Sequence, residues 1–222
     1  MDIYWYGQAC FKLKGKEGSV IIDPFDPVIG LKLPASTAKR GEPKDLESNM
    51  VLVTHGHKDH NNSSAVAGNP MVFSEPGEYE VKGVVVTGIQ SFHDNSDGSV
   101  RGLNTIFHLL LDGLNIVHLG DLGQSELTQE QVQLISQTDI LLIPIGGVYT
   151  INSKEAAQIV SQLEPKIIIP MHFKIDGLVP DLEGVEGFLK EMGVENVETV
   201  SKLSITKDKL PEEPQVVVLS KA

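Results

Sequence analysis

Cysteine is almost absent from this chain, and so are the features of exported or membrane-inserted proteins. Cys10 is the single cysteine among 222 residues, which excludes an intramolecular disulfide framework and a multi-cysteine zinc site. The N-terminal residues have neither a basic flank before a long apolar stretch nor a small-residue cleavage pattern, and no apolar run approaches about 20 residues. We therefore expect a cytoplasmic protein with no membrane insertion, which its detection in a membrane or secreted fraction would contradict.

Basic residues are scarce as well. The chain has 18 lysines and arginines against 30 acidic residues, so its formal net charge is -12. Such a field repels phosphate backbones and anionic lipid surfaces unless a local patch overrides it. Nucleic acid is therefore an unfavourable partner, and a small-molecule substrate is the better expectation.

The sequence has no short-period repeat and no low-complexity tract. Its 222 residues are too few for a large catalytic domain plus an independent binding domain. The 41% hydrophobic and 22% charged residues are ordinary for a globular protein with a sizeable core. We expect one domain over residues 1–222, and no heptad or apolar stripe indicates an oligomeric state.

Apolar runs bounded by turn residues recur along the chain and predict short strands, among them IYWY, SVIID, MVLVT, VVVTGI, TIFHLLL, LNIVHLG, DILLIP and KIIIP. The first half should be mainly antiparallel, with an Asp-Gly hairpin at residues 109–117. In the second half, helical spacing at residues 128–136, 153–163 and 181–192 alternates with strands, each helix opened by Thr, Ser or Asp as an N-cap. This order predicts a layered, sheet-based α/β (α+β) fold.

Residues 26–49 form the one long stretch without clear periodicity, and they are rich in Pro, Gly, Lys and Glu. Loops of that length are often lids or flexible connections. The stretch therefore has two interpretations, a cover over a site or a plain surface excursion.

The strongest chemical signal is the segment HGHKDH, which directly follows the apolar run MVLVT. Side chains at i and i+2 of an extended backbone point to the same side, so His55 and His57 can grip one ion, while Asp59 and His60 beyond the bend can face a second. Three of the seven histidines lie in this hexapeptide, which makes a chance cluster improbable. Imidazole and carboxylate without thiolate suit zinc, iron or manganese in a catalytic site.

Further candidate ligands follow other apolar runs. His93 comes after VVVTGIQSF, Asp121 after LNIVHLG and His172 after KIIIPM. Layered α/β proteins tend to assemble their sites at strand ends. Each residue alone would more often be structural, but their recurrence together with HGHKDH favours ligands.

These residues in this order, with Asp23 in the earlier run SVIIDPF, resemble the full motif set of the metallo-β-lactamase superfamily over residues 1 to about 205. The segments SFHD, RGLNTIF, HLGDLG, PIGGVYT and IIPMHF further resemble its small ascorbate-6-phosphate-lactonase-like branch of Zn-dependent hydrolases. The resemblance implies a four-layer αββα sandwich. Branch members often have His where this chain has Gln124, which leaves specificity open.

The resemblance also implies a ligand set for two divalent ions, with zinc expected and manganese or iron as alternatives. His55, His57 and His93 would hold one ion, Asp59, His60 and His172 the other, and Asp121 would bridge them. Asp23 would orient ligands from behind.

The predicted activity is hydrolysis of a small ester, lactone or phosphoester by a hydroxide that bridges the two metals. Asp59 would orient the nucleophile and carry its proton to the leaving group. The alternatives are a phosphodiesterase or nuclease-type hydrolase, an iron-dependent oxidoreductase on the same fold, and a binding protein in which the metals are only structural.

Several residues have two interpretations each. Arg101, Asn104 and Tyr149 could contact substrate, although an ordinary hairpin entry and a tight turn explain them equally well. His118 should face away from Asp121 and be a buried structural histidine. Cys10, between Ala9 and Phe11, is predicted to be a small buried hydrophobic residue.

Overall fold

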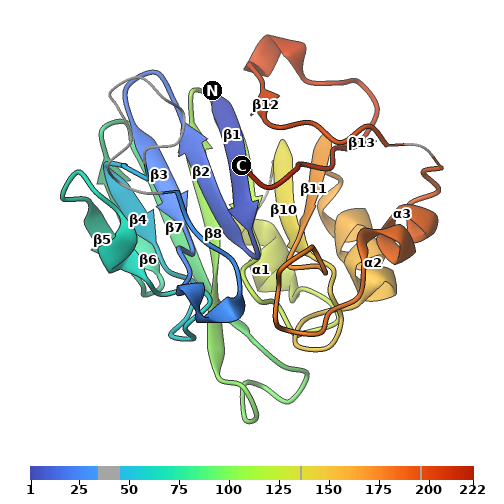
Figure 1. Cartoon of the computed structure of the whole chain (residues 1–222). Helices are drawn as coiled ribbons and strands as arrows, with labels where there is room; N and C mark the ends of the chain where they lie inside the picture. The colour runs from blue at the N-terminus through green and yellow to red at the C-terminus, as the bar shows by residue number, and fades with distance from the viewer. Residues whose placement is uncertain (35–45, 136, 196) are drawn as a thin grey trace.

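The computed structural model describes residues 1–34, 46–135, 137–195 and 197–222, and two sheets face each other within it (Figure 1). The first sheet has the order β12-β1-β2-β3-β4-β5, with β1 at Asp2–Gly7, β2 at Cys10–Lys14, β3 at Ser19–Ile22, β4 at Met50–Leu52, β5 at Met71–Phe73 and β12 at Leu203–Ser204. The second has the order β13-β11-β10-β9-β8-β7-β6, with β6 at Gly77–Val81, β7 at Val84–Phe92, β8 at Leu103–Leu111, β9 at Leu114–His118, β10 at Ile140–Pro144, β11 at Ile167–Met171 and β13 at Gln215–Val216.

Successive side chains along the strands of the first sheet point alternately to its two faces, and both faces are buried. In β4, Met50 and Leu52 pack into the large core between the sheets, whereas Val51 points to a smaller core on the outer face. Cys10 lies fully buried in that outer core, as expected, and burial raises the pKa of its thiol well above the usual value. Strands of a sheet that is buried on both faces have nearly continuous apolar sequences, and the run MVLVT is such a sequence.

Three α-helices accompany the second sheet in the described part of the chain: α1 at Gln129–Leu134, α2 at Ser153–Leu163 and α3 at Val185–Glu191. Helices α2 and α3 pack on each other beside β10 (Figure 1). The outer face of the first sheet is covered by extended chain and by the 3-10 turn Pro27–Ile29, and the described residues place no α-helix there. The mixed α/β, two-sheet fold is thus confirmed.

The predicted helix starts need two corrections. Thr128 caps α1 as expected, but the cap of α2 is Asn152, not Ser153; its side chain accepts from the backbone N–H of Lys154 and Glu155. Asp181 does not open α3, whose N-cap is Gly184.

The late start of α3 follows from the hydrogen bonds of Glu183. Its N–H donates to the carbonyl of Gly146, and its carbonyl accepts from the N–H of Lys174. In a helix that began after Asp181, this carbonyl would accept from the N–H of Gly187, so its bond to Lys174 replaces a helical hydrogen bond.

The Asp-Gly hairpin is confirmed. Leu111 pairs with Leu114 across a two-residue turn in which Asp112 and Gly113 have φ of 53° and 79°, as a type I′ turn requires. Antiparallel pairing dominates the first half, with an exception at β3-β4 and β4-β5, which are parallel. The long connection across residues 23–49 permits the first of these crossovers.

The directions of the strands bring the ends of several of them to one edge of the two sheets, which we call the functional edge. Strands β1, β3 and β4 run the same way in the first sheet, and β7, β9 and β11 share a direction in the second. Two backbone hydrogen bonds join the sheets at this edge: His172 N–H donates to Gln8 O at 3.1 Å, and Thr105 N–H donates to Thr54 O at 2.9 Å. Residues that follow these strands therefore meet in one place.

Part of the 26–49 segment lies outside the described residues, namely 35–45. Of the remainder, Ile29 and Leu31 are buried in the outer core, and Ile29 also lines a cavity at the functional edge. The described part therefore packs against the fold; whether the segment covers the site stays a prediction. No helix among the described residues is long and apolar enough to span a bilayer.

Candidate metal centre

Every predicted ligand directly follows a strand that ends at the functional edge, or lies in the loop after it. The hexapeptide follows β4, His93 follows β7, Asp121 lies three residues beyond β9, and His172 follows β11. Together they form two groups of side chains whose candidate ligand atoms lie within 4.8 Å of one another: His55, His57 and His93 in one, and Asp59, His60, Asp121 and His172 in the other. The structure thus brings the predicted ligands together in two groups, with Asp121 in the second, while their binding of metal stays a prediction.

Asp121 lies between the two groups. Its Oδ2 is 3.2 Å from Nε2 of both His60 and His172, 3.3 Å from Nε2 of His93 and 3.9 Å from Nε2 of His55. One carboxylate oxygen thus faces imidazoles of both groups, which is the geometry expected of a bridging ligand. Asp121 is buried, and its Oδ1 has no hydrogen-bond partner in the described residues.

Asp23 fixes the orientation of His60 and, through Thr54, of His55. Its Oδ2 accepts hydrogen bonds from His60 Nδ1 at 2.8 Å and from the Thr54 hydroxyl at 2.8 Å. Since that hydroxyl donates its one hydrogen to Asp23, it accepts from His55 Nδ1 at 3.0 Å. Both imidazoles consequently turn an unprotonated Nε2 toward the centre, which is the tautomer that binds metal.

The donor set fits a cation. Nε2 of His60 is fully buried without a hydrogen-bond partner, and bare nitrogen and carboxylate lone pairs only a few ångströms apart repel unless positive charge lies between them. Burial lowers the pKa of His55 to about 2. For His60, burial alone would act the same way, but the carboxylates of Asp121, Asp23 and Asp59 outweigh it and raise the pKa well above its usual value. These carboxylates therefore favour positive charge at this position, which a metal ion would supply.

Asn104 lines a cavity beside His55, as a substrate contact would require, but its polar groups bond within the fold. It is buried, its amide N–H groups donate to Ser91 Oγ and Leu119 O, and its Oδ1 accepts from the backbone N–H of Asp121 at 3.0 Å. All its polar atoms are thus committed to holding the loop that carries Asp121. Gly120 has φ of 58°, and a Cβ there would collide with Asn104 Oδ1, so glycine is needed.

Gln8 was not singled out in the sequence. It follows β1, is fully buried, and its side-chain Nε2 lies 2.9 Å from Asp59 Oδ2 and 2.7 Å from His172 Nε2. Gln8, Asp23 and His172 all have positive φ, between 49° and 52°. Non-glycine residues adopt this strained conformation mostly where the surroundings enforce it, and such residues cluster at functional sites. Backbone conformation, which sequence patterns do not reveal, was the missing signal.

A cavity of about 440 Å³ opens onto the centre and is lined by Asp59, Asp121, Arg101 and Tyr149, among others. The guanidinium carbon of Arg101 lies 5.3 Å from the centre of the Tyr149 ring, and Arg101 Nη2 donates to Val148 O at 3.2 Å. Stacking and hydrogen bonding hold the cation in place at the cavity wall.

The loop that carries Arg101 is held by the carboxylate of Asp94. Its two oxygens accept from the backbone N–H groups of Ser96, Gly98, Val100 and Arg101 at 2.7 to 3.0 Å. These hydrogen bonds, led by the one from Arg101, lower the pKa of Asp94. The carboxylate thus stays ionised and the loop stays closed.

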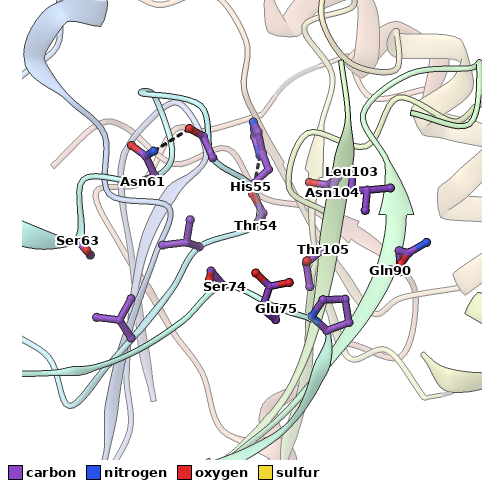
Figure 2. Close-up of a pocket in the computed structure, with 14 residues that line it drawn as sticks. Thr54, His55, Asn61, Ser63, Ser74, Glu75, Gln90, Leu103, Asn104 and Thr105 are labelled. Atoms are coloured by element: carbon purple, nitrogen blue, oxygen red, sulfur yellow. Dashed lines mark hydrogen bonds between the residues drawn. The ribbon is translucent and has the colours of Figure 1, made fainter. Parts of the chain in front are cut away.

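A second cavity, of about 560 Å³, lies on the other side of His55 (Figure 2). Thr54, Asn61, Ser74, Glu75 and Thr105 line it, and they come from both sheets and from the β5-β6 connection. The ligand cluster is therefore bordered by open space on two sides.

Two other residues, His118 and Gln124, form hydrogen bonds within the fold. His118 is buried, its Nδ1 accepts from Gly120 N–H and its Nε2 donates to Ala9 O, so the predicted structural role is confirmed. Gln124 hydrogen-bonds with the backbone of Phe92 and Glu126 and with the side chain of Gln131.

Comparison with known proteins agrees with this geometry. Residues 2–172 match the model of the family described as the beta-lactamase superfamily domain. The chain belongs to this superfamily. A structure from Thermotoga maritima, assigned as a Zn-dependent hydrolase of the metallo-beta-lactamase superfamily, is 36% identical, with a TM-score of 0.77 over 98% of this chain and 97% of that one.

Two archaeal relatives extend the similarity. A metal-dependent hydrolase of Thermococcus onnurineus is 30% identical over 197 residues, covering 78% of this chain and 84% of its own length. Another, from Thermoplasma acidophilum, is 30% identical over 201 residues, covering 81% and 86%. The family expectation is confirmed, while the lactonase-like branch stays a prediction.

Asp23→Asn tests the orientation of the ligands. Asn keeps one acceptor oxygen, which the backbone N–H of Thr54 occupies, so its amide nitrogen would face His60 Nδ1. The His60 proton should then move to Nε2 and block a ligand position. We expect zinc affinity to fall about 10- to 100-fold in a competition titration with a chromophoric chelator. Asp97→Asn, at an exposed position, is the matched control, and equal affinity for both variants would contradict the assigned role.

Proposed function

We propose that this metal-dependent hydrolase cleaves a small ester, lactone or phosphoester that carries an anionic group. The observation that supports the substrate class is the anchored guanidinium of Arg101 in the same cavity as Asp59 and Asp121. In a chain with a net charge of -12, a fixed cation beside the centre favours a negatively charged ligand.

We assign two divalent ions to the site, with His55, His57 and His93 as ligands of one, and Asp59, His60 and His172 as ligands of the other. Asp121 would bridge them. Cations held there would lower the pKa of a coordinated water and polarise the bond under attack. Imidazole and carboxylate ligands without thiolate are compatible with zinc, and also with manganese or iron.

Asp59 is the ligand carboxylate best placed to move a proton. Its side chain is 23% exposed, whereas that of Asp121 is 2% exposed, and it lines the cavity where a substrate would lie. Burial alone would raise the pKa of Asp59, but the neighbouring His60 lowers it below the ordinary value, so the carboxylate is ionised. We assign it the role of general base, and then of general acid toward the leaving group.

The two cavities suit the two parts of such a substrate. The cavity with Arg101 and Lys58 would hold the anionic part. The second cavity, beyond His55, is lined by hydroxyl groups, the amides of Asn61 and Gln90 and the apolar side chain of Leu103, and it would take the other. An acidic chain of this kind gives little support to nucleic acid as a partner, and a cytoplasmic location stays a prediction.

Metal removal tests the function itself. Protein purified without added metal should contain about two equivalents of zinc, manganese or iron by elemental analysis, and it should hydrolyse members of a panel of lactones, phosphomonoesters and phosphodiesters. Chelation should abolish turnover, and restoring the metal should recover it. A protein that holds no metal after reconstitution would contradict the proposal.

Asp59→Asn separates proton transfer from metal binding. The amide keeps one oxygen but cannot take a proton, so kcat should fall by about 10²- to 10⁴-fold. Elemental analysis must show that the variant keeps its metal, with Asp208→Asn, at an exposed position, as the control for a surface carboxylate. Full metal content together with full activity would exclude the assigned role.

Arg101→Gln tests the anionic group. For a phosphorylated substrate, KM should rise about tenfold, because a hydrogen bond to a charged group is lost, whereas KM for the uncharged parent compound should stay the same. Lys154→Gln, at an exposed position of α2, is the control for net charge. Equal changes in KM for both substrates would refute charge recognition by Arg101.

A further inference from the structure

Gln8 is the polar side chain whose place at the centre the assigned roles do not explain. It is fully buried, it lines the same cavity as Arg101, and its Nε2 lies within hydrogen-bond distance of two assigned ligands, Asp59 and His172. Its Oε1 has no partner among the described residues. A buried amide with an unpaired oxygen is costly, so this placement needs a reason.

The orientation of the amide follows from its neighbours. If the amide were reversed, Oε1 would lie against the Asp59 carboxylate, with two acceptors in contact. With Nε2 in this position, each of its two N–H groups has one acceptor, Asp59 Oδ2 and His172 Nε2. The contact of 2.7 Å with His172 requires that Nε2 of the imidazole carry a lone pair and no proton.

That lone pair cannot serve two partners. When His172 Nε2 ligates a cation, it can no longer accept from Gln8, whereas Asp59 still has lone pairs for the other N–H. The backbone of Gln8 is anchored, because its backbone carbonyl accepts from the His172 N–H at 3.1 Å and from the Trp5 indole at 2.8 Å, and the bond to Asp59 holds the side chain. Metal loading therefore frees one N–H of an anchored amide at the wall of the substrate cavity.

We propose that this freed N–H of Gln8 donates to a carbonyl or phosphoryl oxygen of the substrate, next to the bond that is cleaved. The inference rests on the proposed function and adds a substrate-binding donor to it. A preorganised donor of this kind stabilises negative charge that develops on the oxygen. The second N–H of Gln8 donates to Asp59 Oδ2 and holds the amide next to the carboxylate that transfers the proton.

Gln8→Met tests the proposal because methionine preserves the length of the side chain and removes both donors. We expect the zinc-loaded variant to bind inorganic phosphate about tenfold more weakly than the wild type, by the loss of one hydrogen bond to a charged group, in isothermal titration. Its kcat should fall about 100-fold, with little change in zinc content. Gln158→Met, at an exposed position of α2, should match the wild type.

Two results would overturn the proposal. Equal phosphate affinity and kcat at equal zinc content would show that Gln8 touches no substrate. Loss of one zinc equivalent from Gln8→Met, with normal kcat once zinc is saturating, would reduce Gln8 to a support for Asp59.

A spectroscopic measurement on the wild-type protein tests the proposal even if the Gln8→Met variant does not fold or no compound of the substrate panel is hydrolysed. The side-chain amide protons of Gln8, assigned by NMR in the metal-free chain, should shift on zinc loading because one of them leaves His172. A further shift should follow the addition of phosphate. Wild-type inactivity on every substrate together with these shifts would refute the proposed function alone, whereas absence of both shifts at full zinc content would refute the role of Gln8.

Discussion

The hydrogen bonds accepted by Asp23 are the constraint on which the centre depends. One buried carboxylate accepts from His60 and Thr54, and Thr54 in turn accepts from His55. Each bond leaves an imidazole with its free lone pair toward the centre. Since the tautomer of a histidine decides which nitrogen can bind a metal, this one carboxylate controls which nitrogens of His55 and His60 face the centre.

The sheets supply the second level of order. Strands of both sheets end at the same edge, and backbone bonds from His172 to Gln8 and from Thr105 to Thr54 join these ends. The ligand-bearing residues thus belong to the rigid part of the fold. Positive φ at Gln8, Asp23 and His172 turns the chain sharply as it leaves the strand, which aims these side chains inward.

Much of this arrangement could be predicted from the sequence, because its signals are local. The hexapeptide His55–His60 is contiguous, and the other ligands lie just beyond apolar runs whose strand character was clear. Thr54, Gln8 and Asn104 gain their roles only from partners far along the chain, and no local pattern marks such contacts. The start of α3 was missed for the same reason, since the bonds of Glu183 to Gly146 and Lys174 override a local cap signal.

The loop closed by Asp94 has a consequence for the history of such enzymes. Four backbone N–H groups from this loop converge on one carboxylate, so its shape is maintained from within and does not depend on exposed side chains such as those of Ser96 and Ser99. Such side chains can be exchanged without moving His93 or Asp121. A lineage can therefore retune what it accepts while inheriting its chemistry unchanged, and diversification among descendants should concentrate in this short stretch of chain.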